Sequence, residues 1–500
     1  MPDASGQSDR RGPMRLNGRT IAEISRACVV NTRLTIKIKL NLRPRAFSEL
    51  SASVAPLGAE RAGVTPASHC DGKWNVAEMA EIAGLSRPSA DNGANKRLPA
   101  RAGSAQNSPC PGFAALASVP VEEWRALAEH AVEPNGYYLP AWELAVNATA
   151  RGRTGVAALS AWRDASPNQL APIELVPSDD PASEPARLIG LLPVVSLWRA
   201  SKIPLPALAS ASPYGTLCTP LLDRGVAEEA AKGLMSEARN AGAHALVLRD
   251  VSLNGAAMKA LTQALRQDGL QPIILHSHLR ACLDARREAD EVLRDALSAK
   301  KLKELRRQRN RLAEEHGMVR FAVARTTDEV AHAVEVFLAL EASGWKGERG
   351  TALRQDTGDL SFIRSATRGL SETGQCEIVT MHAGQTPVAS AVVLRHQDRA
   401  FYFKLGIDER FAKFSPGVPL TLDLTRHLCA DAVLATADST ASADHPMINP
   451  IWRGRLKIGD VIIPLRRNDP VVSAIHAALT ARHRLREWAR AAMHRLRPAK

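Results

Sequence analysis

The residues best suited by type and spacing to bind a ligand or catalyse a reaction lie in segment 401–428, where an alternating strand leads through a charged turn into a helix. Ser415, Pro416 and Gly417 stand at the predicted start of that helix. Ser is a good N-cap, Pro suits the first helical position, and Gly lets a ligand approach the backbone. A helix start offers N–H groups to an anion, so the segment predicts a phosphate-binding turn that includes Gly417 and Val418.

Charged side chains on the same strand and turn could complete such a site. Strand residues two apart point the same way, so Lys404 is expected to share a face with Tyr402 and to add positive charge. Asp408 and Glu409 follow the strand and are placed to act as a general base, while Tyr402 could act as the acid. In the alternative interpretation, Asp408, Glu409 and Arg410 form only an exposed turn.

A second candidate cluster follows a well-patterned helix. Trp345 and Lys346 stand between Gly344 and Gly347, a spacing that predicts a tight turn. Trp345 could form a wall of an acceptor pocket and Lys346 could contact an anion. Alternatively, Trp345 packs the end of the helix against the core.

Composition sets the limits on these interpretations. The chain has 500 residues, which predicts two or three domains, and a formal net charge of +13. Basic residues are concentrated in segments 1–50, 294–312 and 482–500, which suit phosphate, nucleic acid or anionic lipid but also solvated faces. The 7 cysteines form no CxxC pair, which argues against a zinc site or a disulfide framework and for a reducing compartment. From the cysteine pattern we also expect no bound metal. No apolar run reaches the length of a membrane span, so we expect a cytoplasmic protein.

The order of elements predicts a mixed α/β (α+β) fold in two halves. Segment 1–111 lacks periodicity and is expected to be disordered. Helices and strands alternate in segments 112–276 and 277–469, and segment 470–500 is predicted to be a basic amphipathic helix. Expected elements of the second half are a long helix at 289–315, strands at 376–382, 387–396, 400–407 and 432–436, and helices at 327–343 and 359–372.

Three stretches together resemble one family. FLALEASGWKGERGTAL at 337–353, YFKLGIDERFAKFSPG ending at Gly417, and the basic helix at 297–312 resemble GNAT-superfamily acyltransferases of the cellulose-biosynthesis (CelD/BcsL) type, over segment 121–467. The resemblance implies tandem GNAT-like folds, related to Fem-like proteins, and acyl transfer from acetyl-CoA to an amine or hydroxyl of a polysaccharide or envelope precursor.

The same resemblance gives roles to individual residues. Lys404, Ser415, Gly417 and Val418 would bind the coenzyme along strand 400–407, and an N–H of strand 387–396 would hold the thioester carbonyl. The usual phosphate loop, Arg/Gln-x-x-Gly-x-Gly/Ala, is reduced here to Ser-Pro-Gly.

Two other functions stay open. A Fem-like transferase would use aminoacyl-tRNA, and a degenerate GNAT scaffold would bind an anionic partner without catalysis; in both, the basic helix at 293–312 is the contact surface. GxSxG, HExxH, GxGxxG and P-loop motifs do not occur, which argues against hydrolases, zincins, dehydrogenases and P-loop NTPases. In the first half, the SPYG turn at 212–215 is a further candidate.

Overall fold

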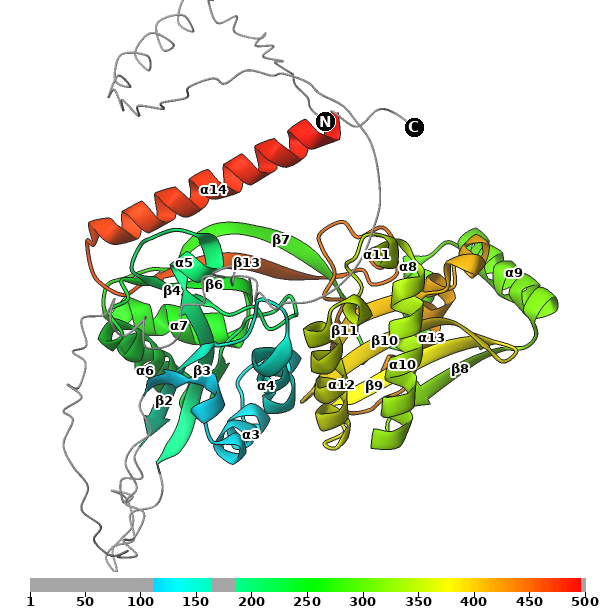
Figure 1. The fold of residues 1–500 in the computed structure, drawn as a ribbon, viewed down its shortest axis with the longest axis horizontal. Helices are drawn as coiled ribbons and strands as arrows, with labels where there is room; N and C mark the ends of the chain where they lie inside the picture. The colour runs from blue at the N-terminus through cyan, green and yellow to red at the C-terminus, as the bar shows by residue number, and fades with distance from the viewer. Residues whose placement is uncertain (1–111, 164–185, 496–500) are drawn as a thin grey trace, which may run out of the picture. The chain divides into compact units, whose positions relative to one another are not determined.

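The computed structural model describes residues 112–163 and 186–495 (Figure 1). The predicted disorder of segment 1–111 lies outside the described residues. Within the described ranges, no helix is both long and apolar enough to cross a membrane.

One 13-stranded mixed sheet runs through both halves of the fold. We call β1 to β7 with their helices the first half, and α8 to β13 the second half. The strand order is β1 (Phe113–Ala115), β2 (Ala157–Arg163), β3 (Arg187–Ser196), β4 (Ala207–Ser210), β6 (Ala245–Ser252), β13 (Gly454–Pro464), β7 (Ile273–Asp284), β12 (Thr436–Asp438), β11 (Arg399–Ile407), β10 (Thr386–His396), β9 (Cys376–Ala383) and β8 (Val319–Ala324), with β5 (Leu221–Leu222) on β3.

The pairing pattern repeats in the two halves. Strands β1 to β4 are antiparallel neighbours, and β4 then runs parallel to β6 over three residue pairs. Strands β8 to β11 are likewise antiparallel, and β11 runs parallel to β12 over three residue pairs. This repeat confirms the mixed α/β class and agrees with the tandem arrangement expected from the sequence.

The halves are joined because each contributes a strand to the other. Strand β13, from the end of the second half, pairs with β6 of the first half. Strand β7, from the first half, pairs with β12 of the second half. Strands β7 and β13 also pair with each other, so the centre of the sheet is a reciprocal exchange.

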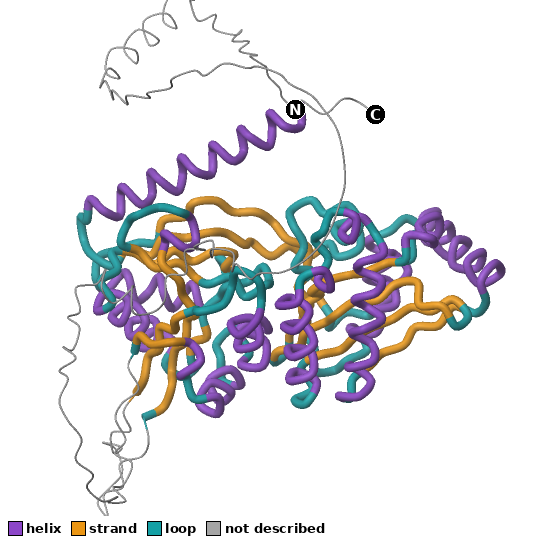
Figure 2. Tube along the Cα trace, in the orientation of Figure 1, coloured by secondary structure: helices purple, strands orange, loops and turns teal. Residues whose placement is uncertain are grey.

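Helices cover both faces of the second half (Figures 1 and 2). Helices α10 and α12 pack on one face of β9 to β11 with the core that includes Phe337 and Phe362, and α13 packs on the other face through Leu420 and Leu424. The α-helices are α3 (Val121–Glu129), α4 (Pro140–Thr149), α5 (Leu197–Ser201), α6 (Ala227–Asn240), α7 (Ala256–Gln267), α8 (Ala289–Ala296), α9 (Ala299–His316), α10 (Thr327–Ser343), α11 (Trp345–Glu348), α12 (Thr357–Ser371), α13 (Gly417–Cys429) and α14 (Pro470–Arg495); the 3₁₀ helices are η1 (Leu116–Ser118), η2 (Gly136–Tyr138), η3 (Leu353–Gln355) and η4 (Glu409–Phe414).

Three expected elements differ from the structure. The helix expected at 289–315 is two helices, because Leu297 is extended and the Ser298 hydroxyl caps α9 by accepting the Lys301 N–H. The strand expected at 432–436 is displaced to β12, which begins at Thr436. Strand β13 was not predicted; a register shift at Asp460 interrupts the two-residue alternation that would have marked it.

His396 joins the halves at the end of β10. Its buried ring accepts the Asn135 N–H at Nδ1 (2.8 Å), so Nε2 carries the proton and donates to the Ala128 carbonyl oxygen (2.8 Å). Burial lowers the pKa of His396 to about 4.

We expect acid to destabilise the fold through His396. Its folded-state pKa lies below the unfolded value of about 6.5, so the unfolded chain binds the proton more readily and stability falls as the pH drops from about 6.5 to 4, by about 3 kcal/mol. Urea unfolding at several pH values would measure this slope. A His396→Gln variant should have a shallower slope over the same range; an unchanged slope would contradict the assignment.

Candidate active site

Strands β11 and β12 part after a short parallel ladder. Arg399, Ala400 and Phe401 pair with Thr436, Ala437 and Asp438, and β11 then continues to Ile407 paired with β10 on its other side. The Thr440 hydroxyl donates to the Tyr402 carbonyl oxygen at 2.6 Å and bridges the first step of the gap. Beyond that bridge, none of the described strands pairs with the gap-facing edge of β11.

The equivalent gap in the first half, between β4 and β6, is closed by the chain itself. The Cys218 N–H donates to the Asp250 carbonyl oxygen at 3.2 Å, and the Thr219 hydroxyl accepts the Ser252 N–H at 3.5 Å. Segment 217–219 therefore pairs with β6 inside the gap of the first half. In the second half, no described strand pairs in this way with β11 beyond the Thr440 bridge. The two halves share a topology, but the second half keeps the more open strand edge.

A β-bulge at Phe403 changes the predicted alternation of β11. Val392 lies opposite Lys404 and Val393 opposite Tyr402, so Phe403 is an extra residue. The prediction that Tyr402 and Lys404 share a face is therefore wrong, because one added residue reverses the alternation. Tyr402 packs with the α13 core, and Lys404 reaches the α10 face.

The Tyr402 hydroxyl lies in the core and 3.3 Å from Thr421 Oγ1 of α13. Burial raises the pKa of Tyr402 to about 12. A proton donor of this kind is shielded from solvent, and its role as the acid stays a prediction.

Lys404 faces a buried carboxylate. Its ammonium nitrogen lies 3.2 Å from Glu341 Oε1, and Glu341 Oε2 accepts the Leu353 N–H at 2.9 Å. Glu341 is buried within α10, so its charge requires such partners. The ion pair holds the Lys404 side chain beside α10. The contact of Lys404 with a coenzyme stays a prediction.

Two glycines allow α10 to approach β11 and the turn after it. A Cβ atom at Gly406 would lie 2.7 Å from the Glu341 backbone nitrogen, and one at Gly344 would lie 2.7 Å from Glu409 Oε1. The Ser343 hydroxyl donates to the Ile407 carbonyl oxygen at 2.9 Å. The end of α10 is thereby held against the end of β11.

This contact brings together two of the predicted clusters. Trp345 and Lys346 open α11 directly after Gly344, so their backbone lies beside the Glu409 turn. A hollow of about 40 Å³ lies at the same place. It is lined by Leu340, Glu341, Gly344, Leu405, Gly406, Ile407 and Glu409.

Asp408 has a different environment from Glu409. Its carboxylate accepts the Arg410 N–H at 3.0 Å and pairs with the Arg410 guanidinium at 2.7 Å, which caps η4. This pairing lowers the pKa of Asp408, which makes it a weaker base. Glu409 is exposed and lines the small hollow, whereas Asp408 lines a separate hollow of about 510 Å³ beside Pro387.

The predicted phosphate-binding turn has few N–H groups to offer. Ser415 adopts a left-handed conformation (φ 49°) and ends η4, so the prediction that it caps α13 is wrong; Pro416 is the N-cap. The Val418 N–H donates to the Ser415 carbonyl oxygen, and Pro419 has no N–H. Of the first three residues of α13, at most Gly417 can donate to a ligand.

The β10 strand does not present its amides to the gap. It pairs with β9 along one edge and with β11 along the other, which places its N–H groups in the two ladders. The expected carbonyl contact from strand 387–396 is therefore wrong. The edge next to the gap belongs to β11.

Tyr214 of the first half reaches this site and was not predicted as a site residue. Its hydroxyl donates to Asp359 Oδ2 at 2.6 Å, the Arg153 guanidinium lies 4.2 Å from its ring centre, and Lys404 Nζ lies 5.5 Å from the same centre. Tyr214 has a left-handed backbone (φ 61°). The SPYG turn is the sequence signal that could have identified it.

Metal ligands do not cluster in the described ranges: no group of three or more His, Cys, Asp or Glu side chains could hold an ion there.

The second half matches a known family. Residues 299–445, which include β11, α13 and β12, match the model described as "Acetyltransferase (GNAT) domain". No curated protein matches the chain. The second half therefore contains a GNAT acetyltransferase domain.

Three solved structures are among those that are similar to this chain. FemX shares 13% identity over 72% of this chain and 98% of its own, with a TM-score of 0.44. L-PGS from Bacillus licheniformis shares 13% identity over 58% of this chain and 86% of its own, with a TM-score of 0.36. A tandem GNAT protein from the clavulanic acid biosynthesis pathway shares 15% identity over 71% of this chain and 99% of its own, with a TM-score of 0.34.

Proposed function

We propose that the second half transfers an acyl group, in the first instance acetyl from acetyl-CoA, to an amine or hydroxyl acceptor. The observation that carries this proposal is the parting of β11 from β12 beside the Phe403 bulge, within the residues that match the GNAT domain. An exposed strand edge can form main-chain hydrogen bonds to an extended amide chain such as pantetheine. We further propose the CelD/BcsL type of acceptor, a polysaccharide or envelope precursor.

Glu409 is the proposed base. It takes a proton from the acceptor nitrogen or oxygen, whose electron pair forms a bond to the acyl carbon. The bond between that carbon and sulfur breaks, and the proton taken up by Glu409 passes, directly or through water, to the coenzyme thiolate, which leaves as the free thiol and restores the carboxylate. Main-chain N–H groups on the β11 edge would stabilise the carbonyl oxygen as negative charge develops.

Other predicted residues take supporting roles in this proposal. Lys404 and Gly417 contact the donor, while Trp345 and Lys346 border the acceptor beside the Gly344 turn. Ser415 and Val418 shape the start of α13. Because the Val418 N–H donates to the Ser415 carbonyl oxygen, it is not available to bind a phosphate. Asp408 holds the turn that presents Glu409.

Hydrogen exchange with acetyl-CoA tests the donor site. We expect slower exchange in peptides that cover 402–407 and 415–420, because the donor would pair with the β11 edge and approach α13. Adenosine 3′,5′-bisphosphate, which lacks pantetheine, should leave 402–407 unchanged. Absence of protection in either segment at millimolar acetyl-CoA would overturn the coenzyme assignment.

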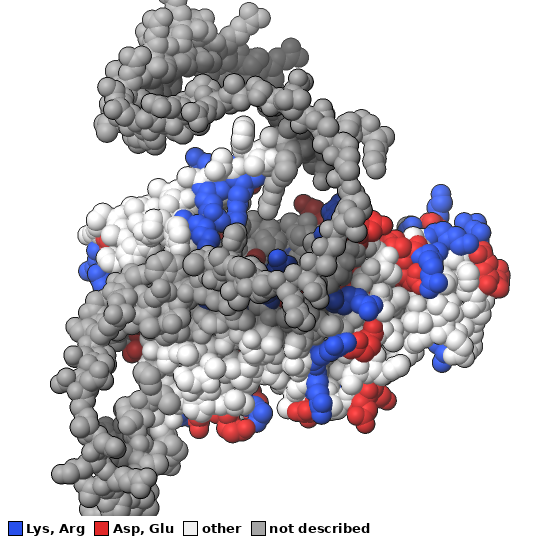
Figure 3. Space-filling model, in the orientation of Figure 1, with Lys and Arg blue, Asp and Glu red and all other residues white. Residues whose placement is uncertain are grey.

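An aminoacyl-tRNA donor is the second candidate, because the α13 start has at most one N–H for a diphosphate. Helix α9 exposes Lys300, Lys303, Arg306 and Arg307, and Figure 3 shows basic side chains at α9 interleaved with acidic ones. Binding of charged tRNA that weakens steeply with salt, without protection by acetyl-CoA, would favour this donor. Binding of tRNA without transfer of its aminoacyl group would favour the third alternative, a non-catalytic GNAT scaffold that binds an anionic partner.

A further inference from the structure

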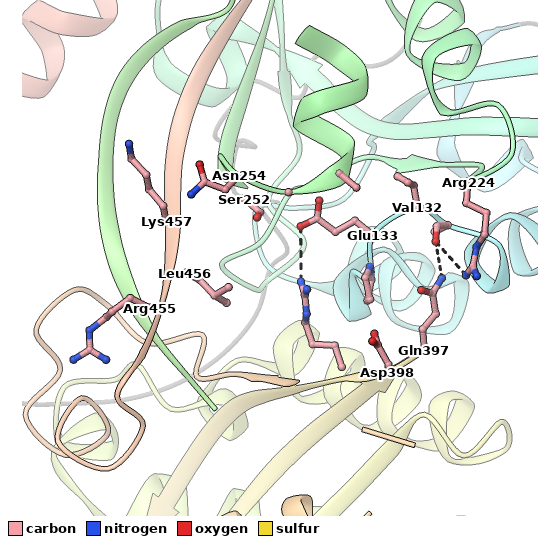
Figure 4. A pocket seen from close by; sticks show the side chains of 15 residues that line it. Val132, Glu133, Arg224, Ser252, Asn254, Gln397, Asp398, Arg455, Leu456 and Lys457 are labelled. Atoms are coloured by element: carbon pink, nitrogen blue, oxygen red, sulfur yellow. Dashed lines mark hydrogen bonds and ion pairs between the residues drawn. The ribbon is translucent and has the colours of Figure 1, made fainter. Parts of the chain in front are cut away.

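Basic side chains around a cavity of about 700 Å³, bordered by both halves, do not converge on a common point (Figure 4). Arg455 and Lys457 of β13 point away from each other. Arg399 lies 3.8 Å from Glu133 Oε1 and 3.1 Å from Thr436 Oγ1, so its charge is already engaged. Positive charge is arranged differently on α14, where it flanks exposed apolar side chains.

The first part of α14 is held on the sheet by an apolar face. Val472 and Ile475 are buried in one cluster with Ile462 of β13, and Leu479 packs against the same cluster. Residues 472, 475 and 479 are three and four apart, so they share one face of the helix. We call this the packed face.

The packed face turns polar after Leu479. Three and four residues later it continues as Arg482 and His483. The ring of His483 stacks on that of His276 of β7, with their centres 4.9 Å apart. Within the described residues of α14, the apolar part of the packed face therefore ends at Leu479.

Two large apolar side chains lie on a different face of α14. Leu485 and Trp488 are three apart and are 64% and 70% exposed. Leu485 stands six residues after Leu479, which places it about 120° around the helix from the packed face. Ala481, one turn before Leu485, is also exposed. We call Ala481, Leu485 and Trp488 the exposed stripe.

Arginine side chains flank the exposed stripe. Arg484 and Arg486 are the sequence neighbours of Leu485, so they lie about 100° around the helix to either side of it, and both are exposed. Glu487 is the only acidic residue of segment 482–500, and it lies 3.1 Å from His483 Nε2. An arginine stem can lie along an apolar surface while its guanidinium reaches an anion.

This arrangement fits an anionic lipid surface better than two other partners. At a bilayer interface, Leu and Trp enter the boundary between headgroups and acyl chains, and Arg pairs with phosphate. RNA can pair with arginine and stack on Trp488, but it gives Leu485 no apolar environment. A second copy of the stripe would bring Arg484 and Arg486 of two chains together, and like charges repel.

We propose that the end of α14 docks in the plane of a membrane surface rich in anionic lipid. Leu485 and Trp488 enter the headgroup boundary, and Arg484 and Arg486 lie against lipid phosphates. The docking is reversible, because a few apolar side chains and charges supply the binding. It does not depend on the acyl-transfer reaction.

Sedimentation with vesicles tests this docking. The full chain should bind vesicles of phosphatidylglycerol and phosphatidylcholine at least tenfold more tightly than vesicles of phosphatidylcholine alone. Raising the salt concentration should weaken the binding, because salt screens the arginine charges. Equal affinity for the two kinds of vesicle, or no binding to either, would overturn the proposal.

A pair of tryptophan variants locates the apolar contact. Trp488→Ala should weaken vesicle binding by about tenfold, because a large apolar side chain no longer leaves water. Trp198→Ala is the matched control, since Trp198 lies on α5 and is 42% exposed. Equal effects of the two changes would overturn the placement of the contact on α14.

A pair of charge variants tests the arginines. The double change Arg484→Gln and Arg486→Gln should weaken vesicle binding by about thirtyfold. The control Arg306→Gln and Arg307→Gln removes the same charge from exposed positions on α9 and should have little effect. Equal weakening by both pairs would show that net charge alone drives binding, which would overturn docking through α14.

The same variants detect the other two occupants. Binding of tRNA that the Arg484 and Arg486 changes weaken, without binding to anionic vesicles, would make α14 an RNA contact and overturn the proposal. Dimers that Trp488→Ala dissociates would place a second copy on the stripe and overturn it as well. Vesicle binding is measured without acetyl-CoA, so failure of the docking and failure of the acyltransferase proposal are separate results.

Discussion

Replacing Glu409 with Gln is expected to lower acyl transfer by about 10²- to 10⁴-fold, with donor binding unchanged. The amide keeps the size of the side chain beside Gly344 but cannot accept a proton from the acceptor. Release of free thiol from acetyl-CoA, with the amine or hydroxyl acceptor that best supports it in a panel, measures the rate. Hydrogen exchange at 402–407 measures donor binding.

Asp408→Asn and Glu314→Gln complete this experiment. Asn at 408 can still cap η4 but loses the ion pair with the exposed Arg410, so we expect a loss of at most about 1 kcal/mol in stability and a small change in rate. Glu314 is exposed on α9, and its variant should match the unmodified protein. If Asp408→Asn abolished transfer while Glu409→Gln did not, the base would be Asp408.

Replacing Ile462 with Ala is expected to destabilise the fold by about 2–5 kcal/mol. Ile462 is fully buried in β13, opposite Val247 of β6 and Ile273 of β7. Its removal leaves a cavity at the exchanged centre of the sheet. Denaturant unfolding followed by circular dichroism measures the loss.

Ile274→Ala is the matched control for this prediction. Ile274 lies on β7 in the same central ladders, but it is 53% exposed. The same change there should alter stability by less than about 1 kcal/mol. Because β13 and β7 connect the halves, both should unfold in one transition; two separate transitions would contradict the view that the exchange makes one cooperative unit.

Most elements of the second half could be predicted because their periodicity is local. The expected strands at 376–382, 387–396 and 400–407 differ from β9, β10 and β11 by one residue at most at either end. Strand β13 escaped prediction because its pairing partners lie far away in the sequence and a bulge at Asp460 disturbs its alternation. Long-range pairing leaves little local signal.

The site was harder to predict than the fold for the same reason. One added residue at Phe403 separates Lys404 from Tyr402, and a two-residue period gives no sign of it. Tyr214 meets Lys404 from the other half of the chain. The particular contact between Gly344 and Glu409 could not be predicted, because sequence spacing does not show which residues of two turns meet.

The strand exchange also sets an order of events during synthesis on the ribosome. Strand β6 is complete at Ser252, but its neighbour β13 begins only at Gly454. At about 5–20 residues per second, the interval between these residues is on the order of 10–40 s. During that time the edge of β6 is exposed and can pair with another nascent chain, so the newly made protein has its greatest need of chaperones before its last strand emerges.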